Sequence, residues 1–441
     1  MTCPISRRGF FKGTLGVSVL AAMRGREVLA QTSGNDVLWV QLVAEGGWDQ
    51  VLFTDPKQGL RTYGTATPQL AGSIPYVSFP EVAPFFQANA SRMLVFNGVD
   101  TSTNNHDVGH RHSMSGSLLE GFPIFAAQVA GSLGADRLLP MFTLWDYSEA
   151  GGLIASNRID YRSGPLIAEL KEMNKGPRVY KSPIGDVSTD APLLPTVGLA
   201  DLNAARAARL QRLQVANKLP GHQRGLDWLK RSQAAAARMP ELDLSPLSPA
   251  LPDTRIGNAK TLVARGIDAF SKGLVTTIVA GVRGFDTHGG QADSVQLEAL
   301  GELFDLAGYV ISAADQRNVP VVMVMSSDFG RTAIREGTTG TGHWPISTML
   351  VVQNSLAAAK GLLPVNRLVG GTTGEVASPN PTLSTVLRAR KINPDTLAFS
   401  DTGVVPTPAH VFRILRRAAK IDTSSVMRDF PLSITGKDLT V

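Results

Sequence analysis

The sequence predicts an α/β fold in which a mostly parallel central sheet is packed between helices. Short apolar runs typical of buried strands recur along the chain, and longer segments of helical periodicity separate them, as expected for a parallel sheet. Asp or a Gly-rich turn directly follows several of these runs. The carboxyl ends of strands hold the functional groups in open α/β sheets, so we expect a site there. With 43% hydrophobic and 18% charged residues, the chain of 441 residues is predicted to be globular.

The N-terminus is predicted to be a targeting segment. Residues 6–12 (SRRGFFK) are similar to a twin-arginine export signal, and residues 14–23 form an apolar run too short to span a bilayer, which needs about 20 residues. Val28, Leu29 and Ala30 then form a plausible cleavage site. We therefore expect a signal peptide over residues 1–30, a periplasmic or secreted mature protein, and the twin-arginine translocase as partner during export. The alternative is a basic first helix of a cytosolic protein.

Charge and cysteine content limit the chemistry of the mature chain. Residues 1–30 carry a net charge of +4 out of +6, so the remainder carries +2, and this charge gives no reason to expect nucleic-acid binding. The single cysteine, Cys3, lies in the signal. A mature chain without thiols has no disulfide and no thiolate metal site, so oxygen and imidazole must hold any metal.

The first half of the chain is predicted to contain two buried strands, over residues 37–43 and 92–99. The first ends in AEGGWD, which places Asp49 near its carboxyl end, although Asp49 could instead only cap the next segment. The second leads into a segment with three of the seven histidines, where a helix starting near Asn104 would place His106 and His110 on one face.

Three hydroxyls, those of Thr101, Ser102 and Thr103, would lie near the N-terminus of that helix, where free N–H groups favour an anion. The simpler interpretation is an N-cap cluster followed by a partly exposed helix. Residues 165–253 contain helical segments, the strongest at 199–217 and 222–239, and are predicted to be a helical insertion between two halves of the sheet.

The second half shows the pattern most clearly. A helix is predicted over 258–272, followed by a strand over 274–282, the loop GFDTHGG, a helix over 294–316, a strand over 319–325 and the loop SSDFGRT. This order places Asp286, His288 and Asp328 on one edge of the sheet, and the glycine-rich loop before a strand at 346–352 could bring His343 back over that edge. A final helix is predicted over 407–420.

Clustered Asp and His without Cys suit Zn²⁺ or Mn²⁺, whereas oxygen-only subsets suit Mg²⁺ or Ca²⁺. A metal pair beside a hydroxyl or water would support displacement at phosphorus or sulfur, which predicts a small anionic ester as substrate. Arg331 could grip such an anion bidentately, or could be a structural arginine paired with Asp328.

Several motifs together resemble a known family. SSDFGRT and GTGHWP, preceded by GFDTHGGQ and a long helix, are similar to blocks of the bacterial family known as domain of unknown function 1501, whose members typically have a twin-arginine signal. The resemblance extends from GGWD to the C-terminal helix. It implies membership of the alkaline-phosphatase/sulfatase superfamily, with an alkaline-phosphatase-like three-layer sandwich and a metal-dependent esterase site. The metal ligands it implies are Asp49, Asp286, His288, Asp328 and His343, with a looser match for His106 and Asp107.

The chain departs from the family pattern at two places. Thr341-Gly342 stands where the family has Arg-Asp before the histidine, and Asp328 stands where it usually has Glu. The resemblance as a whole implies an exported metal-dependent hydrolase of phosphate or sulfate esters, with Thr101, Ser102 or Thr103 as candidate nucleophile. The missing acid favours the alternative, a non-catalytic exported envelope protein that keeps the fold and a bound metal. The oligomeric state is left open.

Overall fold

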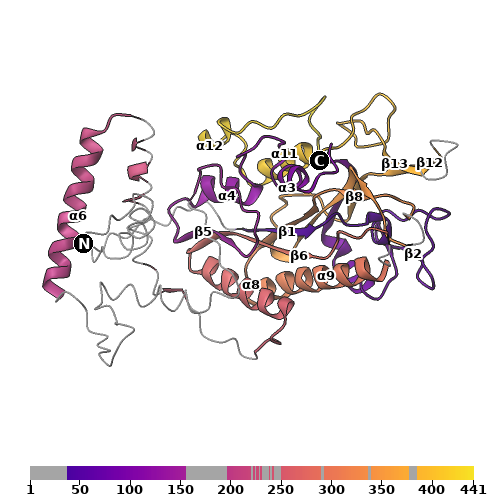
Figure 1. Ribbon diagram of the computed structural model, residues 1–441, viewed down its shortest axis with the longest axis horizontal. Helices are drawn as coiled ribbons and strands as arrows, with labels where there is room; N and C mark the ends of the chain where they lie inside the picture. The colour runs from indigo at the N-terminus through magenta and orange to yellow at the C-terminus, as the bar shows by residue number, and fades with distance from the viewer. Residues whose placement is uncertain are drawn as a thin grey trace, which may run out of the picture.

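A seven-stranded mixed sheet forms the centre of the computed structural model (Figure 1). The structure describes residues 37–154, 196–219, 250–289, 293–335, 339–376 and 385–441, and isolated positions between 222 and 242. In spatial order the strands are β11 (Arg367–Gly370), β4 (Met93–Asp100), β10 (Ile346–Gln353), β7 (Val321–Ser327), β1 (Leu38–Glu45), β6 (Val275–Arg283) and β5 (Leu139–Thr143).

The strand directions explain why the loops meet. β1 pairs in parallel with β6 and β7, β5 with β6, and β11 with β4, whereas β10 is antiparallel to both of its neighbours. The carboxyl ends of β1, β4, β6 and β7 therefore lie on one edge. Because β10 runs the other way, its N-terminal end, and the loop that leads into it, lie on the same edge. The prediction of a mostly parallel sheet is confirmed.

Helices cover both faces of the sheet because β1 is apolar on both. Leu38, Val40 and Leu42 belong to one core cluster, which includes residues of α2 (Ala83–Asn89), α8 (Arg255–Ser271) and α9 (Asp293–Gln316). Trp39 belongs to a second cluster on the opposite face. That second cluster includes residues of α4 (Phe125–Leu133), α11 (Pro408–Ala418) and α12 (Ser425–Arg428). The predicted three-layer arrangement is confirmed (Figure 1).

The remaining described elements are short or peripheral, apart from two helices. α3 (His106–Ser115) follows β4, and α6 (Thr196–Ala216) corresponds to the strongest helix predicted in the insertion. The small elements are η1 (Gln50–Leu52), β2 (Pro68–Ala71), β3 (Ile74–Val77), η2 (Ala90–Arg92), β8 (Gly330–Arg331), β9 (His343–Trp344), α10 (Ser355–Ala358), β12 (Thr372–Val376) and β13 (Thr385–Ala389). The predicted signal over residues 1–30 and most of the predicted insertion over 165–253 lie outside the described residues.

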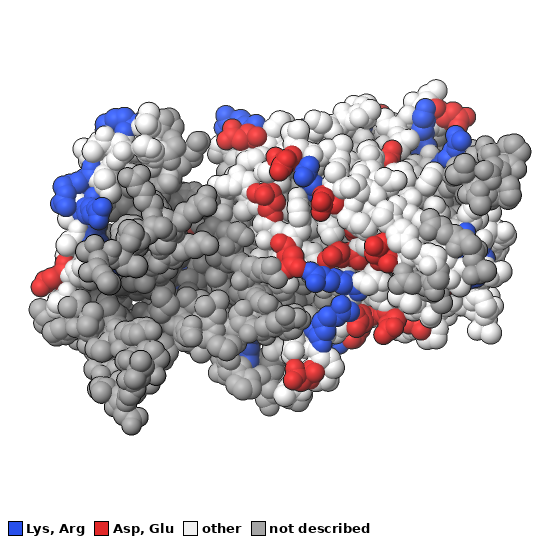
Figure 2. Space-filling view, in the orientation of Figure 1, with Lys and Arg blue, Asp and Glu red and all other residues white. Residues whose placement is uncertain are grey.

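The strands predicted at 37–43, 92–99, 274–282, 319–325 and 346–352 correspond to β1, β4, β6, β7 and β10. The prediction missed β5, β11 and the β12–β13 hairpin. The predicted crossover unit joins β6 through α9 to β7, and β1 lies between these two parallel strands. Within the described ranges, no helix combines the length and apolar character needed to cross a bilayer. Figure 2 shows acidic and basic side chains interspersed over the described part of one face.

Candidate metal centre

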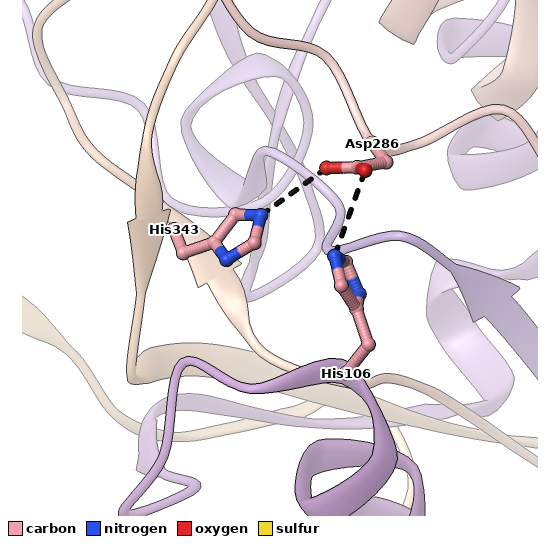
Figure 3. A group of neighbouring side chains, drawn as sticks. All are labelled: His106, Asp286 and His343. Carbon is pink, nitrogen blue, oxygen red and sulfur yellow. Dashed lines mark hydrogen bonds and ion pairs between the residues drawn. The ribbon is translucent and has the colours of Figure 1, made fainter.

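Three side chains converge at the carboxyl edge of the sheet, as Figure 3 shows. Asp286 lies in the loop after β6, His106 is the first residue of α3, and His343 lies on β9, immediately before β10. One ligand atom from each lies within 4.8 Å of the other two. The edge that the sequence predicted to hold the site therefore does bring together two histidines and a carboxylate from distant parts of the chain.

The distances within this cluster match those between ligands of one ion. His343 Nε2 lies 3.2 Å from Asp286 Oδ1, and His106 Nε2 lies 3.6 Å from Asp286 Oδ2. Ligand atoms held at tetrahedral angles around Zn²⁺, at bond lengths of about 2.0–2.1 Å, are separated by about 3.3 Å. Both distances to Asp286 are therefore close to the spacing of two ligands on one divalent ion, and the two histidine nitrogens lie within 4.8 Å of each other.

Hydrogen bonds fix which imidazole nitrogen faces the cluster. His106 Nδ1 lies 2.6 Å from Asp328 Oδ2, and His343 Nδ1 lies 2.8 Å from the carbonyl oxygen of Asn104. Both of these oxygens are acceptors, so each Nδ1 donates its hydrogen and each ring turns Nε2 towards the cluster, the nitrogen through which a neutral imidazole would bind a metal ion. A lone pair and a carboxylate oxygen at these distances repel unless a proton or a metal ion lies between them. Metal-binding histidines are anchored in the same way.

Asp328 supports the cluster from below and is fully buried. Its two carboxylate oxygens accept the N–H of Gly46 at 3.0 and 3.1 Å, and its Oδ2 also lies 3.4 Å from His110 Nε2. Burial raises the pKa of this carboxyl, but the bond with His106 and the nearby charges outweigh burial and hold the pKa below its usual value. The same bond raises the pKa of His106, against the opposing effect of burial. Asp328 thus orients His106, and it is not itself part of the group of described residues that could hold the metal.

Two further predicted residues lie beside the cluster. His288 Nε2 lies 3.1 Å from Asp286 Oδ1 and 3.0 Å from His343 Nε2, so it is within reach as an additional ligand. Asp107 is exposed and lines a cavity of about 450 Å³ beside the cluster. The residues lining this cavity are Glu45, Gly46, His106, Asp107, His110, Arg283, Gly284, Asp286 and Val295.

Asp49 has a different setting from the one its sequence position predicted. Its buried carboxylate lies 2.6 Å from the Arg61 guanidinium and accepts the N–H of Val51, at the cap of η1. Gln296 accepts its backbone N–H. Among the described residues, Asp49 is not part of the group that could hold a metal. Asp49 therefore caps η1, as the alternative raised by the sequence has it, and it also forms a buried ion pair with Arg61.

The three candidate hydroxyls precede α3, as predicted, and those of Thr101 and Thr103 are hydrogen-bonded. Thr101 is buried, and its hydroxyl contacts the carbonyl oxygens of Thr103 and Pro345 at 3.0 and 2.8 Å. The Thr103 hydroxyl accepts the N–H of Asn105. Ser102 is exposed in a left-handed conformation, with φ of 59°. The two threonine hydroxyls are thus held by structural contacts, and the cap of α3 itself is Asn105.

Arg331 is buried, with no exposed side-chain area, and donates to Asp286 Oδ1 at 2.7 Å. The structural role that the sequence left open therefore fits, with Asp286 rather than Asp328 as the partner. Glu45 and Arg283 line the cavity and pair with each other at 3.1 Å. The sequence analysis did not identify Arg283 as a site residue. The signal that could have identified it is its position directly after a predicted strand, beside the GFDTHGG loop.

Glycine is required where the loop after β1 passes the loop after β6. Gly46 has a φ of +117°, and a Cβ added there would lie 2.2 Å from the backbone nitrogen of Asp286. Only a residue without a side chain allows this close approach. The Gly-Gly turn after β1 is therefore part of what places Asp286.

The sheet and the cluster define an α/β protein with a candidate divalent-metal centre at the carboxyl edge of its sheet. The family described as "Protein of unknown function (DUF1501)" matches residues 37–353, which is well over half of the sequence. The chain belongs to this family. A search of the curated proteins finds no match.

Two solved structures illustrate what the chain is similar to. A TAB5 alkaline phosphatase mutant with Mg bound is 10% identical, with a TM-score of 0.27, and the match covers 73% of this chain and 91% of that chain. The sulfatase PsFucS1 from Pseudoalteromonas sp. is 11% identical, with a TM-score of 0.25, and the match covers 81% of this chain and 68% of that chain. TM-scores this low carry no argument about activity, so the site has to be interpreted from its own geometry.

Proposed function

We propose that this protein is an exported, metal-dependent hydrolase of phosphate or sulfate esters. The observation that carries the proposal is the convergence of His106, Asp286 and His343, with ligand atoms within 4.8 Å of one another, beside a cavity of about 450 Å³. Membership of the family that the motifs resemble is consistent with it. Two imidazoles with one carboxylate favour Zn²⁺ or Mn²⁺ over the oxygen-preferring Mg²⁺ and Ca²⁺.

Some residues of the site would hold the ion, and others orient the residues that hold it. His106, Asp286 and His343 would hold the ion, and His288 lies close enough to complete the set. A divalent ion bound there would supply Lewis-acid activation of water and of the ester oxygen. Asp328 holds the Nδ1–H of His106, and the carbonyl of Asn104 holds that of His343, so both rings are oriented before the ion binds.

The nucleophile is better assigned to water than to a side chain. The Thr101 hydroxyl contacts two carbonyl oxygens, and the Thr103 hydroxyl already accepts a backbone N–H. A water in the cavity has direct access to Asp286 and His106, which both line it. We therefore propose direct hydrolysis instead of attack by Thr101, Ser102 or Thr103.

A second candidate function is a non-catalytic envelope protein that binds a metal. It is favoured by the charges around the cavity, because Arg283 is paired with both Glu45 and Asp146, and Asp107 adds another carboxylate. These groups leave little positive charge for an anionic ester. His106, Asp286 and His343 would then serve only to hold the ion.

The test combines metal analysis with turnover. The full chain, exported with its own N-terminal segment, is purified, its bound metal is measured, and aryl phosphate and aryl sulfate esters are offered with and without chelator. We expect one or more divalent ions per chain, hydrolysis that chelation abolishes, and loss of both in His343→Ala. The exposed His222→Ala, whose ring contacts Asn217, serves as the matched control.

Bound metal without turnover of either ester class would contradict the hydrolase and leave the second candidate. Turnover that survives in Thr101→Ala, Ser102→Ala and Thr103→Ala supports water as the nucleophile, whereas its loss in one of them, with bound metal unchanged, would contradict that assignment. Periplasmic recovery that depends on Arg7 and Arg8 tests the proposed export route.

A further inference from the structure

Arg331 lies at the centre of the loops that carry the metal cluster. β8 pairs with β9 so that Arg331 is directly opposite His343. Its side chain is fully buried, and it does not line the cavity beside the cluster. A buried guanidinium is costly unless its N–H groups are satisfied, so the partners of Arg331 show what it does.

All five N–H groups of Arg331 find acceptors within the protein. Nε donates to Gly47 O at 2.8 Å. One terminal nitrogen donates to Thr287 O at 3.0 Å and to Thr341 O at 2.9 Å. The other donates to Gly46 O and to Asp286 Oδ1. An arginine has five such donors, so none is left to bind an ester.

These acceptors belong to three loops that are far apart in the sequence. Gly46 and Gly47 form the turn after β1, Thr287 lies between Asp286 and His288, and Thr341 lies two residues before His343. One side chain therefore ties the backbone beside Asp286 and the backbone beside His343 to the turn whose Gly46 N–H contacts Asp328. No lysine could do this, because an ammonium has only three donors and no planar fork.

Arg331 also determines how the Asp286 carboxylate is presented. It donates to Oδ1 at 2.7 Å, while Oδ2 faces His106 Nε2 at 3.6 Å. The bond restricts rotation of the carboxylate, so that Oδ1 stays beside His343 Nε2, at 3.2 Å, while Oδ2 is directed to His106.

We infer that Arg331 is a positioning residue that preorganises the three loops and the Asp286 carboxylate for metal binding, and that it does not contact the substrate. This inference rests on the proposed metal site and is independent of which ester, if any, is hydrolysed. Arg331 therefore does not bind the anionic ester, and it acts only through Asp286 and the backbones of the loops.

The test compares Zn²⁺ and Co²⁺ binding by the full chain and its variants. We expect Arg331→Lys and Arg331→Gln to weaken Zn²⁺ binding by about 10- to 100-fold, the range for residues that orient a metal ligand. We also expect a changed Co²⁺ absorption spectrum, because the ligand geometry is altered. Lysine keeps the charge, so its failure to restore affinity separates the fork of hydrogen bonds from the charge alone.

Arg317→Gln is the matched control, because Arg317 also pairs with an aspartate, Asp268, at 2.6 Å. It follows the C-terminal end of α9, a helix of 24 residues and so about 36 Å long, whose other end lies near the site. We expect this variant to bind Zn²⁺ like the wild type. Zn²⁺ affinity and Co²⁺ spectrum unchanged in both Arg331 variants would overturn the inference, whatever happens to ester turnover.

A second measurement decides the matter if the Arg331 variants do not fold. Hydrogen exchange is followed in the wild-type chain after chelation, at the amides of Thr332 and Thr341, which donate to Gly342 O and Thr287 O. If Arg331 preorganises the loops, these amides stay protected without metal. Rapid exchange in the metal-free chain would show that the ion orders the loops, and would overturn the inference.

Discussion

The two histidines of the cluster show how single contacts orient ordinary side chains as candidate metal ligands. His106 and His343 each have one ring nitrogen bonded to an acceptor oxygen, from Asp328 and Asn104 respectively. The other nitrogen of each ring faces Asp286. The sequence predicted Asp286 from its position after a buried strand and His343 from its glycine-rich loop before the strand at 346–352. The contact with the Asn104 carbonyl has no sequence signal, because any residue offers a carbonyl.

Asp49 and Arg331 show the limit of sequence reasoning at this scale. Both follow a buried strand, as functional residues do, but the partner of each decides its role. Arg61, 12 residues after Asp49, supplies an ion pair that engages the carboxylate. The acceptors around Arg331 come mostly from backbone carbonyls in three loops, and residue types do not report their positions.

Asp286→Asn should change how the metal-free chain responds to acid. Burial alone would raise the pKa of Asp286, but hydrogen bonds from Arg331 and His343 outweigh it and lower the pKa from 3.8 to about 2. The ionised carboxylate therefore stabilises the native state above pH 4 or so, and this contribution is lost as the pH falls through about 2. We expect Asp286→Asn to lack this part of the acid dependence.

The measurement is the urea midpoint in chelator at a series of pH values between about 2 and 6. The wild type and Asp286→Asn should differ most at the upper end and converge towards the lower end. Asp395→Asn, an exposed carboxylate paired with Lys437 on the surface, is the control and should follow the wild type. Curves for wild type and Asp286→Asn that stay parallel over the whole range would contradict the assigned pKa.

At the scale of elements, the antiparallel strand β10 explains why the site is complete. The four parallel strands β1, β4, β6 and β7 deliver their following loops to one edge, and β10 brings His343 there from its N-terminal side. The apolar runs predicted these five strands. They did not reveal β5, which follows a stretch without clear periodicity, or β11, which is only four residues long.

The start of α3 is a second element that matters for the site. Asn105 caps this helix by accepting the N–H of Val108, and His106 is its first residue. We expect Asn105→Ala to reduce the free energy of unfolding by about 1 kcal/mol, the usual cost of losing a cap. It should also weaken Zn²⁺ binding, since the frayed first turn carries His106.

Ser424→Ala is the control for this prediction, because Ser424 caps α12 in the same way by accepting the N–H of Met427. It should lower stability without changing Zn²⁺ affinity. Calorimetric titration together with urea unfolding separates the two effects. Equal Zn²⁺ affinity in Asn105→Ala and the wild type would show that the cap contributes stability only.

At the scale of the whole molecule, the three-layer architecture was predictable because local and global signals agree. Strands buried on both faces appear as continuous apolar runs, and α9 shows helical periodicity over its full length. The register between strands was not predictable, and so neither was the insertion of β1 between β6 and β7. The edge that holds the site follows from strand direction alone, which is why the sequence located it.

The central claim is that His106, Asp286 and His343 hold one divalent ion. The most direct measurement is anomalous X-ray scattering at the zinc edge, from crystals of the chain grown with Zn²⁺ and without phosphate or citrate. We expect an anomalous peak within bonding distance, about 2.0–2.2 Å, of Nε2 of both histidines and of an Asp286 oxygen. Crystals of His343→Ala should lack the peak. Crystals grown with saturating Zn²⁺ that show no anomalous peak at this cluster would contradict the claim.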